Sequence, residues 1–281
     1  MNRPGIPPVS GGDKTERGFS LVEIAIGLVI LSLAAVGLVA SISKQTEQSN
    51  VRATTRTLEQ INNALLAFAG SNGRLPCPAI ATGNGQEAIA SNAGGIVRCS
   101  TEAGFLPAVT LGLNGVDTAG MLYDEFDDGA GSGNGTYRRA YRYGISRLAG
   151  TTIDALTSPG LGAPTLMSRR VDVQQSIAAG QGLFICRSST DMTAGANRCG
   201  TTANTLATNS VAVVWSQGIN GNDTALWSAD ERQNAYRSVA RAWVSRSFAP
   251  AGATDGSFDD QLTWISYPML ADTLVRGGFV Q

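Results

Sequence analysis

The side chains of this 281-residue chain that could do chemistry are carboxylates and thiols, because the sequence contains no histidine. That composition excludes His-based catalytic triads, His-ligated zinc and imidazole acid–base catalysis. Two pairs of adjacent aspartates occur, at Asp127-Asp128 and Asp259-Asp260. Neighbours in sequence need not converge in a cleft, and surface turns explain both pairs. Since the sequence also offers no nucleophile beside a base, we expect a protein that is not an enzyme.

Oxygen-bearing side chains between residues 220 and 231 follow the spacing of a degraded calcium-binding loop. Positions 1, 3, 5 and 12 of such a loop would be Asn220, Asn222, Thr224 and Glu231. Ala225 stands where a calcium loop has glycine, and only Glu231 among the four brings a charge, so this loop alone would bind weakly. Further carboxylates could come from Asp223, Asp259 and Asp260 if the fold brings them close.

The alternative interpretation of the same segment requires no ion. A turn rich in glycine and asparagine would lead into a helix whose capping box runs from Ser228 to Glu231. The sequence therefore demands no cofactor, and a structural calcium ion is expected only under the first interpretation.

The charge balance narrows the class of partner. The formal net charge is −1, so there is no basic surplus to neutralise phosphates, and we expect no nucleic-acid partner. Apolar residues make up 43% of the chain and charged residues 15%, which excludes a disordered chain. The densest apolar block lies near the N-terminus.

That block, Phe19–Ile42, contains Glu23 as its single charged residue. A helix needs about 20 apolar residues to cross a bilayer, so residues 19–42 predict one membrane span. The polar leader, residues 1–18, carries three basic and two acidic residues and should stay in the cytoplasm. The chain from Lys44 onward would then lie outside the inner membrane, in the periplasm.

Three interpretations fit this N-terminus. A cleaved secretory signal would have a shorter apolar region without an acid inside it. An ordinary signal anchor explains the length of the stretch, but neither Glu23 nor the abrupt border between Gly18 and Phe19. The third interpretation rests on residues 17–23 (RGFSLVE), which closely resemble the prepilin peptidase site of bacterial type IV prepilin-like proteins.

This resemblance implies a pathway of processing and assembly. Prepilin peptidase would cleave after Gly18, and the new N-terminal residue, Phe19, would be N-methylated. Glu23 would neutralise that amino group on a neighbouring subunit and so set the register of a helical filament. A carboxylate costs on the order of 2.5–3.5 kcal/mol at the centre of a bilayer, so Glu23 should have a partner, unless it reaches the cytoplasmic headgroups. The implied partners are other pilin or pseudopilin subunits, the peptidase, an inner-membrane assembly platform and membrane lipid.

The helical pattern continues over residues 43–70. Apolar or small residues recur at alternating steps of three and four, at Val51, Thr54, Leu58, Ile61, Leu65 and Phe68. No proline interrupts residues 19–69, and Gly70, Gly73 and Pro76 should end the helix. We therefore expect one long helix with a transmembrane half and an amphipathic half that packs on a globular head.

Residues 71–281 predict an α+β head in which an antiparallel sheet covers the amphipathic half of the helix, as the pilin-like resemblance also implies. The candidate strands are Tyr137–Ser146, Leu183–Ser188, Val211–Ser216 and Leu262–Ser266. Short helices should follow Ser228 and Ser266. In the first, apolar residues follow at helical spacing at Tyr236, Val239, Ala240 and Trp243, and the second should end at Gly277. Residues 129–135 (GAGSGNG) form a flexible loop by composition.

Four cysteines occur in this head, Cys77, Cys99, Cys186 and Cys199. In a periplasmic or extracellular compartment disulfides persist, and four cysteines allow three connectivities. We favour pairing between neighbours in sequence, which gives Cys77–Cys99 and Cys186–Cys199. The chain has no C-x-x-C spacing, so zinc binding and redox catalysis fit poorly.

Taken together, these patterns predict a structural subunit of a type IV pilus-like or type II secretion pseudopilus filament. The size of the head favours a minor or tip-proximal subunit, because a large head at every lattice position would crowd a filament. The alternative is a single-span, membrane-anchored periplasmic adhesin or receptor that is not built into a filament. Such a protein would keep residues 1–18.

Overall fold

The computed structural model of the chain describes residues 20–93, 96–126, 139–146, 182–190, 192, 198–221, 223–235, 241–249 and 256–279, without the side chains of 33–44, 91–93, 96 and 209. The chain divides into two compact units, Met1–Ser49 and Asn50–Gln281. The predicted leader, residues 1–18, and the predicted loop at 129–135 lie outside the described residues.

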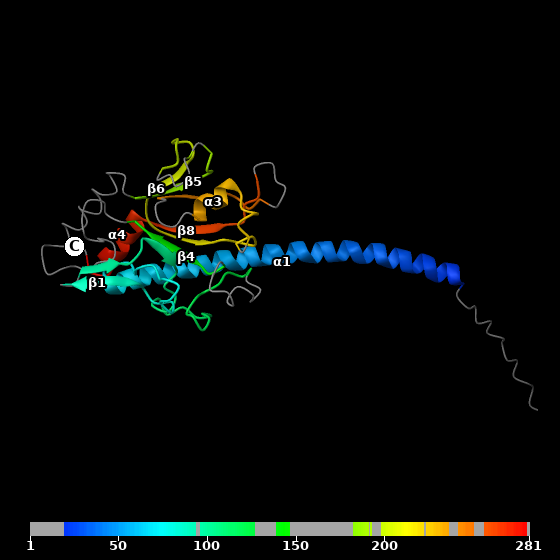
Figure 1. Cartoon of the computed structure of the whole chain (residues 1–281), viewed down its shortest axis with the longest axis horizontal. Helices are drawn as coiled ribbons and strands as arrows, with labels where there is room; N and C mark the ends of the chain where they lie inside the picture. The colour runs from blue at the N-terminus through cyan, green and yellow to red at the C-terminus, as the bar shows by residue number, and fades with distance from the viewer. Residues whose placement is uncertain are drawn as a thin grey trace, which may run out of the picture. The chain divides into compact units, whose positions relative to one another are not determined.

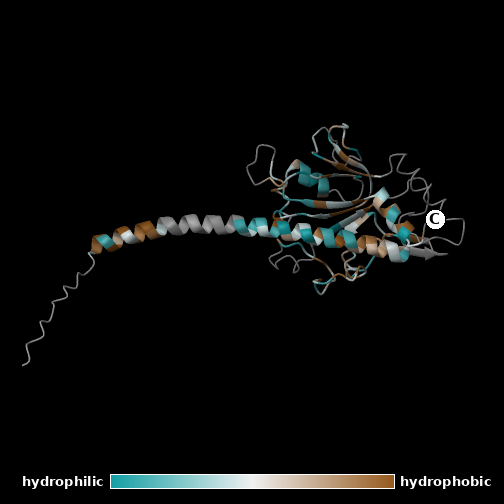
Figure 2. Ribbon diagram, turned by 180° about the vertical axis from the view of Figure 1, so that it is seen from behind, coloured by the Kyte–Doolittle hydropathy of each residue, from teal (hydrophilic) through white to brown (hydrophobic). Residues whose placement is uncertain are grey.

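Helix α1 (Leu21–Asn72) begins in the first unit and ends in the second (Figure 1). Its first described turns are strongly apolar (Figure 2), and large hydrophobic side chains from Leu21 to Leu31 are exposed on the isolated chain. Over the residues that the structure describes, no helix is both long enough and apolar enough to cross a membrane.

The end of α1 lies at Asn72, slightly beyond the predicted end at residue 70. Gly73, rather than Gly70, supplies the left-handed conformation that ends the helix, with φ +67°, and its N–H donates to the carbonyl oxygen of Ala69 (2.8 Å). The side chains of Ser71 and Asn72 donate to the carbonyl oxygens of Ala67 and Phe68, at 3.0 and 2.9 Å, which adds side-chain hydrogen bonds to the last turn of the helix.

The predicted buried face of α1 in the second unit agrees with the structure in the centre of the segment and differs from it at both ends. Thr54, Leu58, Ile61 and Leu65 are buried, whereas the predicted Val51 and Phe68 are half-buried. At the C-terminal end the buried position is Ala69, four residues after Leu65. A helix has 3.6 residues per turn, so residues three or four positions apart lie on the same face. The step from Leu65 to Ala69, rather than to Phe68, therefore moves the buried face by one position.

The head contains a six-stranded mixed sheet and a separate hairpin. The hairpin pairs β1 (Ile89–Ala93) with β2 (Ile96–Cys99). The strands of the larger sheet are β3 (Ala103–Phe105), β4 (Arg142–Ile145), β5 (Leu183–Cys186), β6 (Thr205–Ser216), β7 (Ala242–Val244) and β8 (Gln261–Ser266). Their order is β3-β4-β6-β5-β7, and β8 pairs with β6.

The expectation of a fully antiparallel sheet is wrong at one pair of strands. β5 and β7 run parallel, with Phe184 opposite Ala242 and Cys186 opposite Val244. Parallel neighbours need a long crossover connection, and here β6 and α3 (Ala229–Ala235) lie between them in sequence. The α+β class itself is confirmed: a long N-terminal helix is followed by strands with short helices.

Each candidate strand coincides with an observed strand, although the bounds differ. β6 starts six residues before the predicted Val211, because its first part pairs with β5 and its second part lies between β4 and β8. Residues 137–138 of the first candidate strand lie outside the described residues. Of the two predicted helices, α4 (Tyr267–Arg276) follows Ser266 and is capped by Gly277. α3 follows Ser228 but ends at Ala235. The expected helical position of Trp243 is wrong, because Trp243 lies in β7, where it pairs with Ile185 of β5, and residues 236–240 lie outside the described residues.

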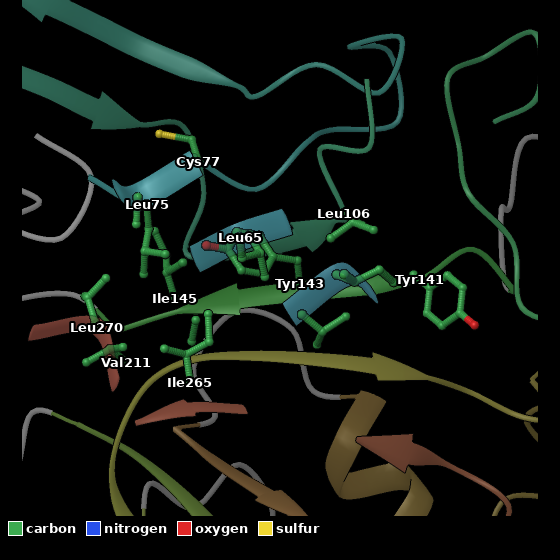
Figure 3. Close-up of a cluster of buried hydrophobic side chains, with 14 of the residues drawn as sticks. Leu65, Leu75, Cys77, Leu106, Tyr141, Tyr143, Ile145, Val211, Ile265 and Leu270 are labelled. Atoms are coloured by element: carbon green, nitrogen blue, oxygen red, sulfur yellow. The ribbon is translucent and has the colours of Figure 1, made fainter. Parts of the chain in front are cut away.

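The main core lies where the amphipathic part of α1 meets the sheet (Figure 3). Ile61 and Leu65 from α1 pack with Tyr143 and Ile145 of β4, Val211 of β6 and further buried residues from β8 and α4. Burial of such side chains is worth about 1.5–3 kcal/mol each. The helix is therefore part of the head's own core.

The two disulfides favoured by the sequence are confirmed. Cys77 is bonded to Cys99, and Cys186 is bonded to Cys199. All four sulfurs are buried, so each bond lies within the packed head. No thiol is left free.

Candidate functional site

The N-terminal motif places Glu23 in the first turn of α1. The N–H of Glu23 donates to the carbonyl oxygen of Ser20 (3.0 Å) and to its hydroxyl oxygen (3.2 Å), so Ser20 caps the helix. The Glu23 side chain is exposed on the isolated chain, and its negative charge is favourable beside a helix N-terminus. Gly18 and Phe19, the predicted cleavage and methylation residues, lie outside the described residues.

Three buried carboxylates, those of Glu231, Asp259 and Asp260, converge inside the head; we call them the carboxylate cluster. One oxygen from each lies within 4.8 Å of the oxygens from the other two. The residues are only 2%, 8% and 6% exposed, respectively. Glu231 comes from α3, whereas Asp259 and Asp260 directly precede β8. The fold thus brings together three of the seven residues that the sequence proposed as metal ligands.

Main-chain and amide donors hold both carboxylate oxygens of Glu231. The N–H of Ser228 donates to Oε2 (2.6 Å), and the N–H of Glu231 donates to the Ser228 hydroxyl oxygen (3.3 Å), which forms a capping box at the start of α3. At Oε1, the N–H of Asp259 and the side-chain amide of Asn220 each donate at 3.1 Å. One carboxylate therefore connects the start of α3 to two other segments.

The two aspartates are held by different neighbours. Oδ2 of Asp259 accepts the N–H of Asn220 (3.1 Å), and a Cβ at Gly218 would overlap the Asp259 carboxylate, so only glycine fits there. Oδ2 of Asp260 accepts from the side-chain amide of Asn234 in α3 (2.8 Å). Asn234 also pairs with both the N–H and the carbonyl of Val244, at 2.7 and 3.0 Å, which fixes α3 against β7.

Burial raises the pKa of both aspartates. Desolvation brings the pKa of Asp259 to about 7; the N–H of Asn220 opposes this shift, and the negative charge of Glu231 reinforces it. Desolvation also raises the pKa of Asp260 well above its usual value, with the Asn234 amide opposing and three carboxylates, those of Asp259, Glu231 and Asp124, reinforcing. The ionised cluster would bury several negative charges together, which is costly without a cation or protons.

Two oxygen atoms at the cluster are not reached by solvent and have no hydrogen-bond partner among the described residues. They are Oδ1 of Asp259 and Oδ1 of Asn220, whose amide nitrogen already contacts Glu231. Buried polar atoms without partners are uncommon, and an ion absent from the structure is one physical explanation. Asp259 and Asp260 also line a groove of about 510 Å³ between α1 and β8.

The remaining metal candidates lie elsewhere or outside the described residues. Asp223 is exposed, and its carboxylate accepts the N–H of Ala225 (3.0 Å), so it stabilises a turn. Thr224 is exposed as well, and Asn222 lies outside the described residues. Sequence reasoning missed Asn234, because a polar residue of a short helix carries no signal of burial.

The comparisons with known proteins bear on the N-terminal segment. Residues 13–39 match the family described as the prokaryotic N-terminal methylation motif, which is characteristic of type IV prepilin-like proteins. The resemblance of residues 17–23 to such proteins is therefore confirmed for the N-terminal segment. No curated protein and no solved structure matches the chain.

Proposed function

We propose that the chain is a non-enzymatic, structural subunit of a type IV pilus-like or type II secretion pseudopilus filament. The match of residues 13–39 to the methylation motif carries this proposal. In it, prepilin peptidase removes residues 1–18, Phe19 is N-methylated, and residues 19–42 hold the precursor in the inner membrane with the head in the periplasm. The mature protein then leaves the bilayer for a periplasmic or extracellular filament with the help of an assembly platform.

The position of Glu23 supports its role in assembly. It lies in the first turn of α1, four residues after the proposed new N-terminus, and its side chain is exposed on the isolated chain. A carboxylate surrounded by apolar residues is stabilised by an adjacent positive charge. The methylated amino group of a neighbouring subunit supplies that charge, and the pair fixes the axial register between subunits.

The packing of α1 in the second unit supports a pilin-like arrangement. Ile61 and Leu65 belong to the core of the head, so the helix cannot leave the head without exposing that core. The exposed apolar side chains between Leu21 and Leu31 would be buried against the same segment of other subunits. The size of the head favours a minor or tip-proximal position, where crowding is least.

Mass spectrometry of the mature N-terminus, on protein from membranes and from sheared filaments, tests this proposal. We expect a chain that begins at N-methylated Phe19 and is present in the filament fraction. A chain that retains residues 1–18 and never enters filaments would refute the proposal and favour the membrane-anchored adhesin or receptor. Replacing Gly18 with leucine should leave only the uncleaved precursor.

The register role of Glu23 is tested by Glu23→Gln, with Glu47→Gln as the matched control on the same helix. Glu23→Gln should be cleaved normally but be depleted from filaments, because the charge that pairs with the neighbouring amine is lost. The control should be incorporated as the wild type is. Equal incorporation of both variants would remove the register role and leave the cleavage assignment intact.

A further inference from the structure

We propose that the head binds one calcium ion at the carboxylate cluster of Glu231, Asp259 and Asp260. This inference concerns the head alone and does not depend on whether the chain enters a filament. It rests on the geometry of the cluster, on the buried oxygens without partners, and on the absence of competing ligand types.

The spacing of the three carboxylates fits a shared ion. Calcium binds oxygen at about 2.3–2.6 Å, so two oxygens on one ion can be at most about 5 Å apart. The ligand oxygens of the cluster lie within 4.8 Å of one another. They therefore need only small movements to converge on one cation.

The oxygens without partners supply the second, independent observation. Oδ1 of Asp259 is buried and accepts no hydrogen bond from the part of the chain that the structure describes, while Oδ2 of the same carboxylate is held by the N–H of Asn220. Oδ1 of Asn220 is likewise buried without a donor, on an amide that contacts Glu231. A cation at the cluster gives Asp259 Oδ1 its missing partner, and a small rotation of the Asn220 amide offers a fourth oxygen.

The charges around the cluster leave a negative excess. Asp230 and Asp124 are also buried nearby, and Arg246 is paired with Asp230 (Nε to Oδ2, 2.8 Å). Arg246 further donates to two main-chain carbonyls, at 3.1 and 3.3 Å. Arg139, a further cation among the described residues, donates to the main-chain carbonyl of Ile219 (2.8 Å). These two guanidinium groups therefore do not offset the repulsion among the carboxylates of the cluster. One divalent ion would offset it.

The available ligand types select calcium over the transition metals. The chain has no histidine, and all four cysteines are in disulfides, so neither imidazole nor thiolate can contribute. A site built from carboxylate and amide oxygens suits calcium or magnesium. Magnesium keeps several of its waters and demands octahedral geometry, whereas calcium tolerates an irregular, mostly dehydrated site such as this one.

An ion has a route to the site and a structural consequence once bound. Asp259 and Asp260 line the groove between α1 and β8, so the cluster is reached from that side. A bound ion would tie together the start of α3, the loop at Gly218–Gly221 and the segment before β8. We therefore expect calcium to stabilise the head.

Calorimetric titration of the purified, chelator-treated chain with calcium chloride tests binding directly, and thermal unfolding measures its effect. We expect saturable binding of one ion, and a rise in Tm of about 5–10 °C at a calcium concentration 100 times Kd. Magnesium chloride at the same concentration should raise Tm less. Absence of both heat and Tm shift at millimolar calcium would overturn the proposal, and this result requires no variant to fold.

Asp259→Asn, with Asp223→Asn as the matched control, identifies the site. Asp259→Asn should lose the calcium-dependent rise in Tm yet be no less stable than the wild type in chelator, because it removes a buried negative charge. The exposed Asp223→Asn should respond to calcium as the wild type does. A full calcium response in Asp259→Asn would contradict this placement; if that variant does not fold, Asp260→Asn serves the same comparison.

Discussion

Gly85 and Gly120 place their backbones in direct contact across two loops of the head. A Cβ on Gly85 would overlap the carbonyl of Gly120, and a Cβ on Gly120 would overlap the carbonyl of Asn84. Both glycines have positive φ, +67° and +74°, and the side chain of Asp117 accepts the N–H of Met121 (2.8 Å) to hold this turn. The contact thus requires glycine on steric and on conformational grounds.

Gly120→Ala should destabilise the head by about 2–5 kcal/mol, since it combines left-handed strain with overpacking against backbone atoms that cannot yield. Gly112→Ala is the matched control: its φ is +67°, but a Cβ there meets nothing within 4 Å. It should cost only about 1–2 kcal/mol. Urea unfolding of both variants measures the difference, and equal losses would mean that the close contact contributes nothing.

Removal of the Cys186–Cys199 disulfide should lower the free energy of unfolding. The bond closes a loop with a sequence separation of 13, for which the chain-entropy model gives about 3 kcal/mol. Replacing both cysteines with serine should lower stability by at least that amount, because both positions are buried. Urea unfolding in oxidising buffer measures it. Reductant breaks both disulfides of the wild type, so the reduced wild type should lose at least as much stability as the oxidised variant. A loss confined to the variant would point to the serines instead.

Local periodicity explains which parts of the fold could be predicted. The amphipathic face of α1 repeats over several turns, and the apolar run that begins at Val211 fits a central strand, so both were predicted from sequence. β3 and β7 have three residues each, too few for any period to emerge. Their place in the sheet depends on pairing with distant strands, such as β7 with β5, which no local pattern encodes.

The same distinction between local pattern and long-range pairing applies to the candidate site. Glu231 was assigned to a capping box from its spacing to Ser228, and that local contact is present. The sequence could predict the convergence of Glu231 with Asp259 and Asp260 only if the fold brought them close, because this contact depends on how the segment before β8 packs against α3. Asp223 belongs to the same loop as Asn220 yet is exposed, and nothing in the local sequence distinguishes the two positions.

Leu65→Ala should destabilise the head, although Leu65 lies on the same helix as the proposed membrane segment. Its side chain is fully buried in the main core, so its truncation should cost about 2–5 kcal/mol. Asn63→Ala, at an exposed position on the opposite face, is the control and should change stability by less than about 0.5 kcal/mol. Urea unfolding followed by circular dichroism compares them; equal, small effects would mean that the helix does not contribute to the core.

The calcium-free head should lose stability as the pH rises from about 4 to about 7. The pKa of Asp259 is raised by burial to about 7 from an ordinary value of 3.8. The folded state therefore binds a proton that the unfolded state has released over this range, and stability falls as that proton is lost. The raised pKa of Asp260 extends the decline to higher pH. Thermal unfolding in chelator across this range measures the effect.

Two comparisons identify the groups responsible for this pH dependence. Asp259→Asn should flatten the decline, because the amide does not titrate, whereas Asp223→Asn, at the exposed position, should preserve it. Calcium should remove most of the decline in the wild type, since the ion replaces protons as the source of positive charge. A wild-type pH dependence in chelator that matches that of Asp259→Asn would show that burial of Asp259 does not raise its pKa.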